Sequence, residues 1–223
     1  MNDEPLFFAV TRLTKVVISS LEKDKIIAYV TDLKNKVPKQ QKFFEYCLEW
    51  KLAPWVFLQL KKHALDPYFE SEILHLFQEE YSKIKLQNTK RNEEAIRFLK
   101  LFKKHGIDVA ILKGNLFANT FYGDVGYKRM NDFDILIHAN DWVKVQTIYE
   151  ELNYIPLGFG WAGEKQKPAN FSHVGTPFIS SNFLCIVGTQ WGIKAPTARY
   201  KVDINKVWKN TIDPSVYGAA QVR

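Results

Sequence analysis

The order of apolar and polar residues divides the chain into a helical first part and a mixed second part. Through residues 1–92, apolar side chains recur every three or four positions, which is the spacing of amphipathic helices. The first predicted helix spans residues 5–22, and Asp24 or a neighbour caps the second. Later helices begin near Pro54, since proline fits a first turn, and at Asp66. The pattern therefore predicts an all-helical region over residues 1–92.

The last helix of this series has the clearest local signals. Its apolar positions lie on one face of residues 93–104, lysines gather in its last turn, and Gly106 ends it. An apolar run at 109–112 follows directly, as expected for a strand. A second apolar run covers 135–137, and helical spacing lies between the two runs. The pattern over residues 109–137 therefore predicts, in this order, a strand, a glycine turn, a short helix, a loop and a second strand.

Downstream of residue 137, the pattern alternates between one helix and short strands. Asn140 or Asp141 is expected to cap a helix that begins at Trp142. Short apolar runs then predict strands at 154–156 and within 171–191. His173 lies close to one of these runs, where it could contact a substrate, but we expect its side chain to make a structural hydrogen bond instead.

The acidic pair before the second apolar run is the main chemical feature of the sequence. Because alternate residues of a strand share a face, Asp132 and Asp134 project together while Phe133 enters the core. Neighbouring carboxylates repel unless a cation lies between them, and Mg²⁺ prefers one or two carboxylates plus phosphate oxygens. Gly114 allows backbone to approach a phosphate, and a helix starting there would direct N–H groups at it. The alternative is a capping Asp132, a solvated Asp134 and an ordinary turn.

Composition narrows the class of protein further. No apolar run approaches the roughly 20 residues that span a bilayer, and the acidic N-terminus argues against a signal peptide. Cys47 and Cys185 form neither a disulfide framework nor a zinc pattern, so we expect buried thiols in a reducing, cytoplasmic protein. The net charge of +7 lies mainly in the first half. This charge suits either a polyanionic partner or an ordinary lysine-rich surface.

The segment LKG…FY…YKRMNDFDILI resembles an uncharacterised bacterial nucleotidyltransferase family. This family is part of the superfamily typified by DNA polymerase β, whose signature is a helix-opening glycine turn followed by Asp-x-Asp. The resemblance covers roughly residues 93–223. It implies an α+β nucleotidyltransferase fold with a small mixed sheet, preceded by the helical region 1–92. The C-terminal segment resembles one that continues into further helices, so the chain is either incomplete there or a short member.

The resemblance also implies an activity. We expect a Mg²⁺- or Mn²⁺-dependent transfer of a nucleotidyl group from a nucleoside triphosphate, ATP above all, to a hydroxyl of RNA, protein or a small molecule. Asp132 and Asp134 are the expected metal-binding and catalytic residues. The expected nucleotide-binding residues are Lys113, Gly114, Asn115 and Arg129. For Arg129, a surface ion pair is an equal alternative.

A third acid, usual in this superfamily, has two competing placements. Spacing aligns the usual acidic strand with residues 187–191, which puts Gly188 in the acid's position. Residue type instead selects Asp203 as the catalytic candidate. If Gly188 holds the position, the chain is a slow or inactive relative that binds nucleotide, RNA or a protein partner. A toxin–antitoxin-type component that modifies tRNA or protein is a further possibility.

Overall fold

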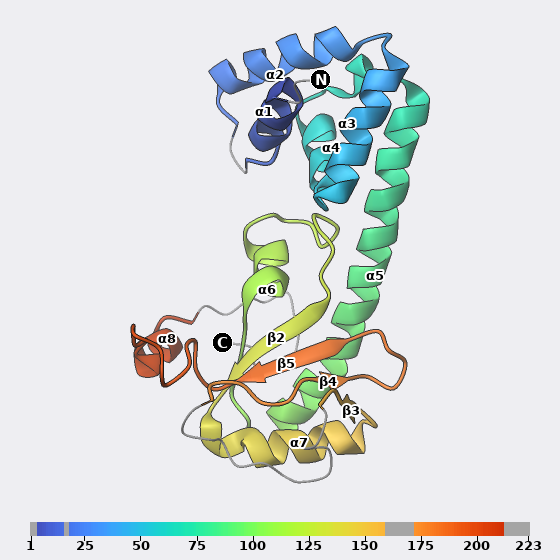
Figure 1. Cartoon of the computed structure of the whole chain (residues 1–223). Coiled ribbons are helices and arrows are strands. Elements are labelled where there is room, and N and C mark those ends of the chain that lie inside the picture. The colour runs from blue at the N-terminus through green and yellow to red at the C-terminus, as the bar shows by residue number, and fades with distance from the viewer. Residues whose placement is uncertain (1–3, 16–17, 159–171, 212–223) are drawn as a thin grey trace. The chain divides into compact units, whose positions relative to one another are not determined.

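The computed structural model describes residues 4–15, 18–158 and 172–211 (Figure 1). The chain forms two compact units. The first comprises residues 1–88 and 124–129, and the second comprises residues 89–123 and 130–223. The division between 88 and 89 falls inside a single helix that also contains the sequence-based boundary at residues 92 and 93.

The first unit is helical, as the apolar spacing predicts. Its elements are α1 (Glu4–Leu13), α2 (Ser20–Leu33), α3 (Val37–Glu49), α4 (Ala53–Lys62), the 3-10 turn η1 (Asp66–Tyr68) and the first part of α5 (Ser71–Lys104). A cluster of aromatic rings forms the centre of its core. The Phe43 ring lies 5.6 Å from that of Phe69 and 6.0 Å from that of Phe77, between ring centroids. The predicted helix start near Pro54 is confirmed, because Pro54 lies in the first turn of α4.

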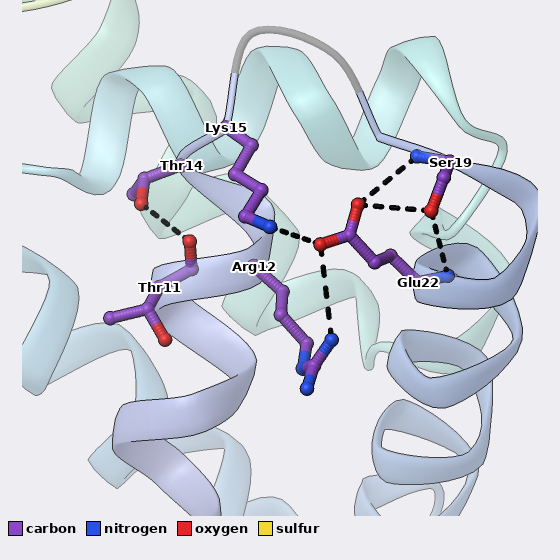
Figure 2. Close-up of polar contacts among 6 residues, drawn as sticks. All are labelled: Thr11, Arg12, Thr14, Lys15, Ser19 and Glu22. Atoms are coloured by element: carbon purple, nitrogen blue, oxygen red, sulfur yellow. Dashed lines mark hydrogen bonds and ion pairs between the residues drawn. The ribbon is translucent and has the colours of Figure 1, made fainter.

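The predicted single helix over residues 5–22 is wrong, because α1 ends at Leu13 and α2 begins at Ser20. The cause is a capping box at the start of α2, drawn in Figure 2. The Glu22 backbone N–H donates to Ser19 Oγ at 3.3 Å, and the Ser19 backbone N–H donates to the Glu22 carboxylate at 3.2 Å. Ser19, not Asp24, is therefore the cap, and the apolar periodicity runs across a true break.

A short segment from the middle of the sequence also belongs to the first unit. The hydroxyl of Tyr81 donates to Asp124 at 2.9 Å. The Asn88 side-chain amide donates to the carbonyls of Val125 and Lys128 at 2.6 and 2.8 Å. Residues 124–129, which lie shortly before the acidic pair in sequence, are thus held by α5.

The second unit contains a five-stranded mixed sheet in the order β1-β2-β5-β4-β3. The strands are β1 (Val109–Ile111), β2 (Asp132–Ile137), β3 (Ile155–Pro156), β4 (Phe178–Ile179) and β5 (Ile186–Gln190). Strands β2 and β5 are parallel, and the other neighbouring pairs are antiparallel. The helical elements of this unit are the rest of α5, α6 (Lys113–Thr120), η2 (Ala139–Asp141), α7 (Trp142–Glu151) and α8 (Ile204–Lys209). The predicted α+β class with a small mixed sheet is confirmed.

Helices α5 and α7 cover one face of this sheet. The Phe98 ring on α5 lies 5.7 Å from that of Phe133 on β2 and 6.0 Å from that of Tyr149 on α7, between centroids. Phe133 is fully buried in this core, as the alternation along the strand predicts. Asp141 holds the position before α7, but its side chain caps no backbone N–H and pairs with Lys144 at 3.0 Å instead. The predicted side-chain cap is therefore wrong.

Two further expectations concern the whole chain. Cys47 and Cys185 are free and buried, as expected, and burial raises the pKa of the Cys185 thiol to about 12. Among the described residues, no helix combines the length and apolar character needed to cross a membrane.

Candidate active site

The acidic pair opens onto a cavity of about 280 Å³ within the second unit. Its walls come from the first residue of α6, from β2 and β5, and from the segment 173–177. Both Asp132 and Asp134 line it, while Phe133 between them faces the core. The alternation of side chains along β2 thus brings the two carboxylates to one side of the sheet.

Asp134 is the more buried member of the pair, with 8% of its surface exposed. Burial raises its pKa above the usual 3.8, and the charge of Asp132 adds to this rise. The ammonium of Lys113 acts in the opposite direction, because its Nζ lies 2.7 Å from Asp134 Oδ2. The Lys113 side chain is itself 63% exposed. Asp134 is therefore a partly desolvated carboxylate whose charge partner can leave readily for solvent or for a ligand.

The turn between β1 and α6 differs from the predicted glycine turn. Lys113 has the positive φ, 55°, whereas the glycines with positive φ in the described parts of the chain are Gly106 and Gly123. A lysine in this region is strained, since its β-carbon crowds the backbone. This conformation brings the base of the lysine side chain to the cavity. The conformational freedom expected of Gly114 is therefore not what forms the turn.

Two hydrogen bonds fix this turn to the strand that carries the acids. The Leu112 backbone N–H donates to the Asp134 carbonyl at 2.9 Å, and the Asn115 side-chain amide donates to the Asp132 carbonyl at 2.9 Å. Asn115 is only 3% exposed. In the structure, the Asn115 side chain binds the backbone of β2 and so helps to position this strand. A direct contact between Asn115 and a nucleotide stays a prediction. The turn and the acidic pair consequently form one unit of structure.

Two predicted residues lie outside this group. Arg129 is exposed and belongs to the first unit, so its placement beside a nucleotide stays a prediction. Asp203 is the N-cap of α8, where its carboxylate accepts the backbone N–H groups of Asn205 and Lys206 at 3.0 and 3.4 Å. It is not among the described residues that line the cavity.

Gly188 lies directly beside Asp134 on the neighbouring parallel strand. A β-carbon at this position would lie 2.6 Å from Asp134 Oδ1, which is closer than real β-carbons approach oxygen. A side chain at position 188 would therefore require the Asp134 carboxylate to move. The strand position that spacing aligns with the third acid is thus next to the acidic pair and carries no side chain.

For His173, sequence reasoning favoured a structural hydrogen bond over a contact with substrate. His173 lines the cavity, and its ring makes no hydrogen bond within the described parts of the chain, contrary to the expected structural bond. Its backbone carbonyl instead accepts the N–H of Trp191 at 2.9 Å. Local pattern offered no signal, because the pairing of Val174 with Gln190 that places this segment joins residues remote in sequence.

The residues of the cavity fit one kind of metal site. No group of three or more His, Cys, Asp or Glu side chains is arranged to hold a metal within residues 4–15, 18–158 and 172–211. A closed site built from protein ligands alone is therefore absent from this part. Two carboxylates in one cavity do suit Mg²⁺ or Mn²⁺ when a substrate supplies phosphate oxygens as further ligands.

These features define a cavity over the central strands β2 and β5, with paired acids and a lysine at the start of α6. The family model described as "Uncharacterised nucleotidyltransferase" matches residues 37–223 of the chain, and the protein therefore belongs to this family. The match begins well before residue 93, so the family extends into the helical region that we had set apart from the resemblance. No curated protein and no solved structure matches the chain.

Proposed function

We propose that this protein is a Mg²⁺- or Mn²⁺-dependent enzyme that transfers a nucleotidyl group from a nucleoside triphosphate, ATP above all, to a hydroxyl of an acceptor. The supporting observation is that Asp132, Asp134 and Lys113 share one cavity in a chain of the nucleotidyltransferase family. The order of glycine turn, helix and Asp-x-Asp strand supports a place in the polymerase β-like superfamily, within its bacterial family.

The charged residues Lys113, Asp132 and Asp134 of the cavity, and Asn115 nearby, each have a definite task in this proposal. Asp132 and Asp134 would hold the divalent cation, which when bound draws negative charge from the phosphate oxygens. Lys113 would leave Asp134 and turn its ammonium to the polyphosphate, as its exposed side chain permits. Asn115 keeps the turn in register with β2 through the Asp132 carbonyl.

One observation favours a second candidate function. Position 188 has no side chain although it adjoins Asp134, and Asp203 is engaged as the cap of α8. A relative with two acids would bind nucleotide, RNA or a protein partner with little or no turnover. The two functions therefore differ in the rate at which a bound nucleotide is transferred to an acceptor.

The two functions separate in a direct assay. Each α-³²P-labelled nucleoside triphosphate is incubated with Mg²⁺ and, separately, with bulk tRNA, with the protein itself and with glycerol as acceptors. We expect incorporation by the native protein and a loss of about a thousandfold in Asp134→Asn, since several kcal/mol of charge stabilisation would be removed. Nucleotide binding without incorporation in any reaction would favour the second function.

Asp203→Asn is the matched control, because asparagine caps a helix as well as aspartate does. Full activity in this variant supports the assignment of Asp203 to structure. A loss of activity as large as that of Asp134→Asn would instead show that Asp203 takes part in catalysis.

A further inference from the structure

Four titratable residues line the cavity among those that the structure describes: Lys113, Asp132, Asp134 and His173. Under the proposed function, the two aspartates hold the cation and Lys113 serves the polyphosphate. Transfer to a hydroxyl also requires a group that removes the hydroxyl proton. His173 is the remaining titratable side chain in the described cavity wall.

The segment that carries His173 is firmly placed. The Trp191 backbone N–H donates to the His173 carbonyl at 2.9 Å, and the Gly175 N–H donates to the Thr189 carbonyl at 2.9 Å. Gly175 also packs against the buried ring of Trp142, where an added β-carbon would lie only 2.5 Å from ring carbons. These contacts join the segment to β5 and α7, so the histidine is held on a rigid part of the unit, as a catalytic group requires.

The imidazole of His173 is also available for chemistry. It is half-buried, and none of the hydrogen bonds within the described residues uses either ring nitrogen. A neutral imidazole has one nitrogen with a free lone pair, and histidine is the side chain that most often acts as a general base near neutral pH. The other titratable residues of the cavity wall are Lys113, Asp132 and Asp134.

We propose that His173 is the general base of the transfer, in place of the carboxylate that position 188 does not supply. This inference rests on the proposed function. The hydroxyl proton of the acceptor passes to a ring nitrogen of His173, and the oxygen forms a bond to the α-phosphorus. The bond from that phosphorus to the bridging oxygen breaks, and its electron pair leaves with pyrophosphate.

The test compares native protein, His173→Ala and His105→Ala in the release of pyrophosphate from ATP, with Mg²⁺ and bulk tRNA, protein or glycerol as acceptor. His105 is exposed at the end of α5 and is the matched histidine control. We expect His173→Ala to lose at least about a hundredfold in kcat, the usual contribution of general base catalysis, with unchanged ATP binding by calorimetry. His105→Ala should match the native protein.

Two readouts distinguish a base from a structural residue. Imidazole added to His173→Ala should restore part of the rate, because His173 lines the cavity that free imidazole can enter. The native rate should fall as the pH is lowered through the range in which histidines protonate, and this fall should be missing in the variant.

The outcomes separate this inference from the proposed function. An active native protein whose His173→Ala variant keeps its rate, or whose lost rate imidazole does not restore, overturns the role of His173 alone. A native protein that binds ATP but transfers nothing to any acceptor overturns both.

Discussion

Two carboxylates, one in each unit, respond to their surroundings in opposite ways. Glu22 in the helical unit receives a hydrogen bond from Lys15, two from Ser19 and a nearby charge from Arg12, as Figure 2 shows. These partners lower its pKa from 4.5 to about 2, with the Lys15 bond as the largest cause. Asp134 in the second unit is largely removed from water, and burial raises its pKa despite Lys113.

The difference shows what each unit does with charge. Glu22 is ionised in a setting that favours ionisation, so its charge stabilises the start of α2. Burial opposes the ionisation of Asp134, so a charge at this position lowers the stability of the folded state. A position where folding opposes the charge is where a ligand of opposite charge would contribute most, and perturbed carboxylates gather at functional sites for this reason.

Among changes that test this contrast between Glu22 and Asp134, Gly188→Ala should have the largest effect. The new β-carbon would force the Asp134 carboxylate away from its present place, only 2.6 Å distant. A displacement of about 1 Å in a catalytic group can cost about a hundredfold in rate, and we expect a loss of that size in nucleotidyl transfer. Gly158→Ala is the control, since among the described residues its β-carbon would meet the Thr176 side chain and no catalytic group. Equal rates in both variants would contradict a strict position for Asp134.

A smaller effect should follow from Lys113→Met, which keeps the length of the side chain and removes its charge. The ammonium 2.7 Å from Asp134 competes with any cation for that carboxylate. Without it, we expect Mn²⁺ to bind about tenfold more tightly in the absence of nucleotide, which corresponds to about 1.4 kcal/mol. Titration of Mn²⁺ by electron paramagnetic resonance measures this directly, with Lys144→Met as control because Lys144 pairs with Asp141 outside the cavity. Unchanged affinity would show that the Lys113 pair is too weak to compete.

The two regions also differed in how far sequence could predict them. The shared face of Asp132 and Asp134 follows from the alternation of a single strand, a local rule, and the strand alone sufficed to predict it. The facing of Gly188 and Asp134 depends on a parallel register between β2 and β5. Spacing placed Gly188 on the correct strand, but only the folded sheet brings it beside the acid. The positive φ of Lys113 was not predicted either, because the neighbouring Gly114 is the residue type that usually adopts a positive φ.

In the helical unit, the prediction of a single helix over residues 5–22 failed for a different reason. The Ser19-x-x-Glu22 signature of a capping box is present in the sequence, but apolar periodicity continues across it and hid the break. Leu21, whose place in the apolar periodicity would put it on the buried face, is in fact 64% exposed. A local polar signal thus overrode a weaker apolar one.

The capping box gives a prediction of about 1 kcal/mol. Ser19→Ala removes the oxygen that accepts the Glu22 N–H, and such a loss typically destabilises by about that amount, or roughly 2–4 °C in Tm for a chain of this size. Thermal unfolding followed by circular dichroism measures it. Ser71→Ala, at the first residue of α5, offers a comparison. A fall in Tm no larger for Ser19→Ala than for this variant would mean that the box adds little to stability.

The smallest effects lie in the pH dependence of stability, where the two carboxylates should differ in sign. The folded-state pKa of Glu22 lies below its unfolded value, so its contribution is present above pH 4.5 and is lost as the pH falls towards about 2. The folded-state pKa of Asp134 lies above 3.8, so its neutral form favours folding below that pH, and this contribution is lost as the pH rises through the folded-state pKa. Urea unfolding from pH 3 to pH 7 should therefore show Glu22→Gln losing stability relative to the native protein as the pH rises. Asp134→Asn should gain stability over the same rise, because the exposed Lys113 partner offsets only part of the burial cost. Two difference curves of the same sign would mean that Lys113 outweighs the burial of Asp134, and the contrast between the two units would fail.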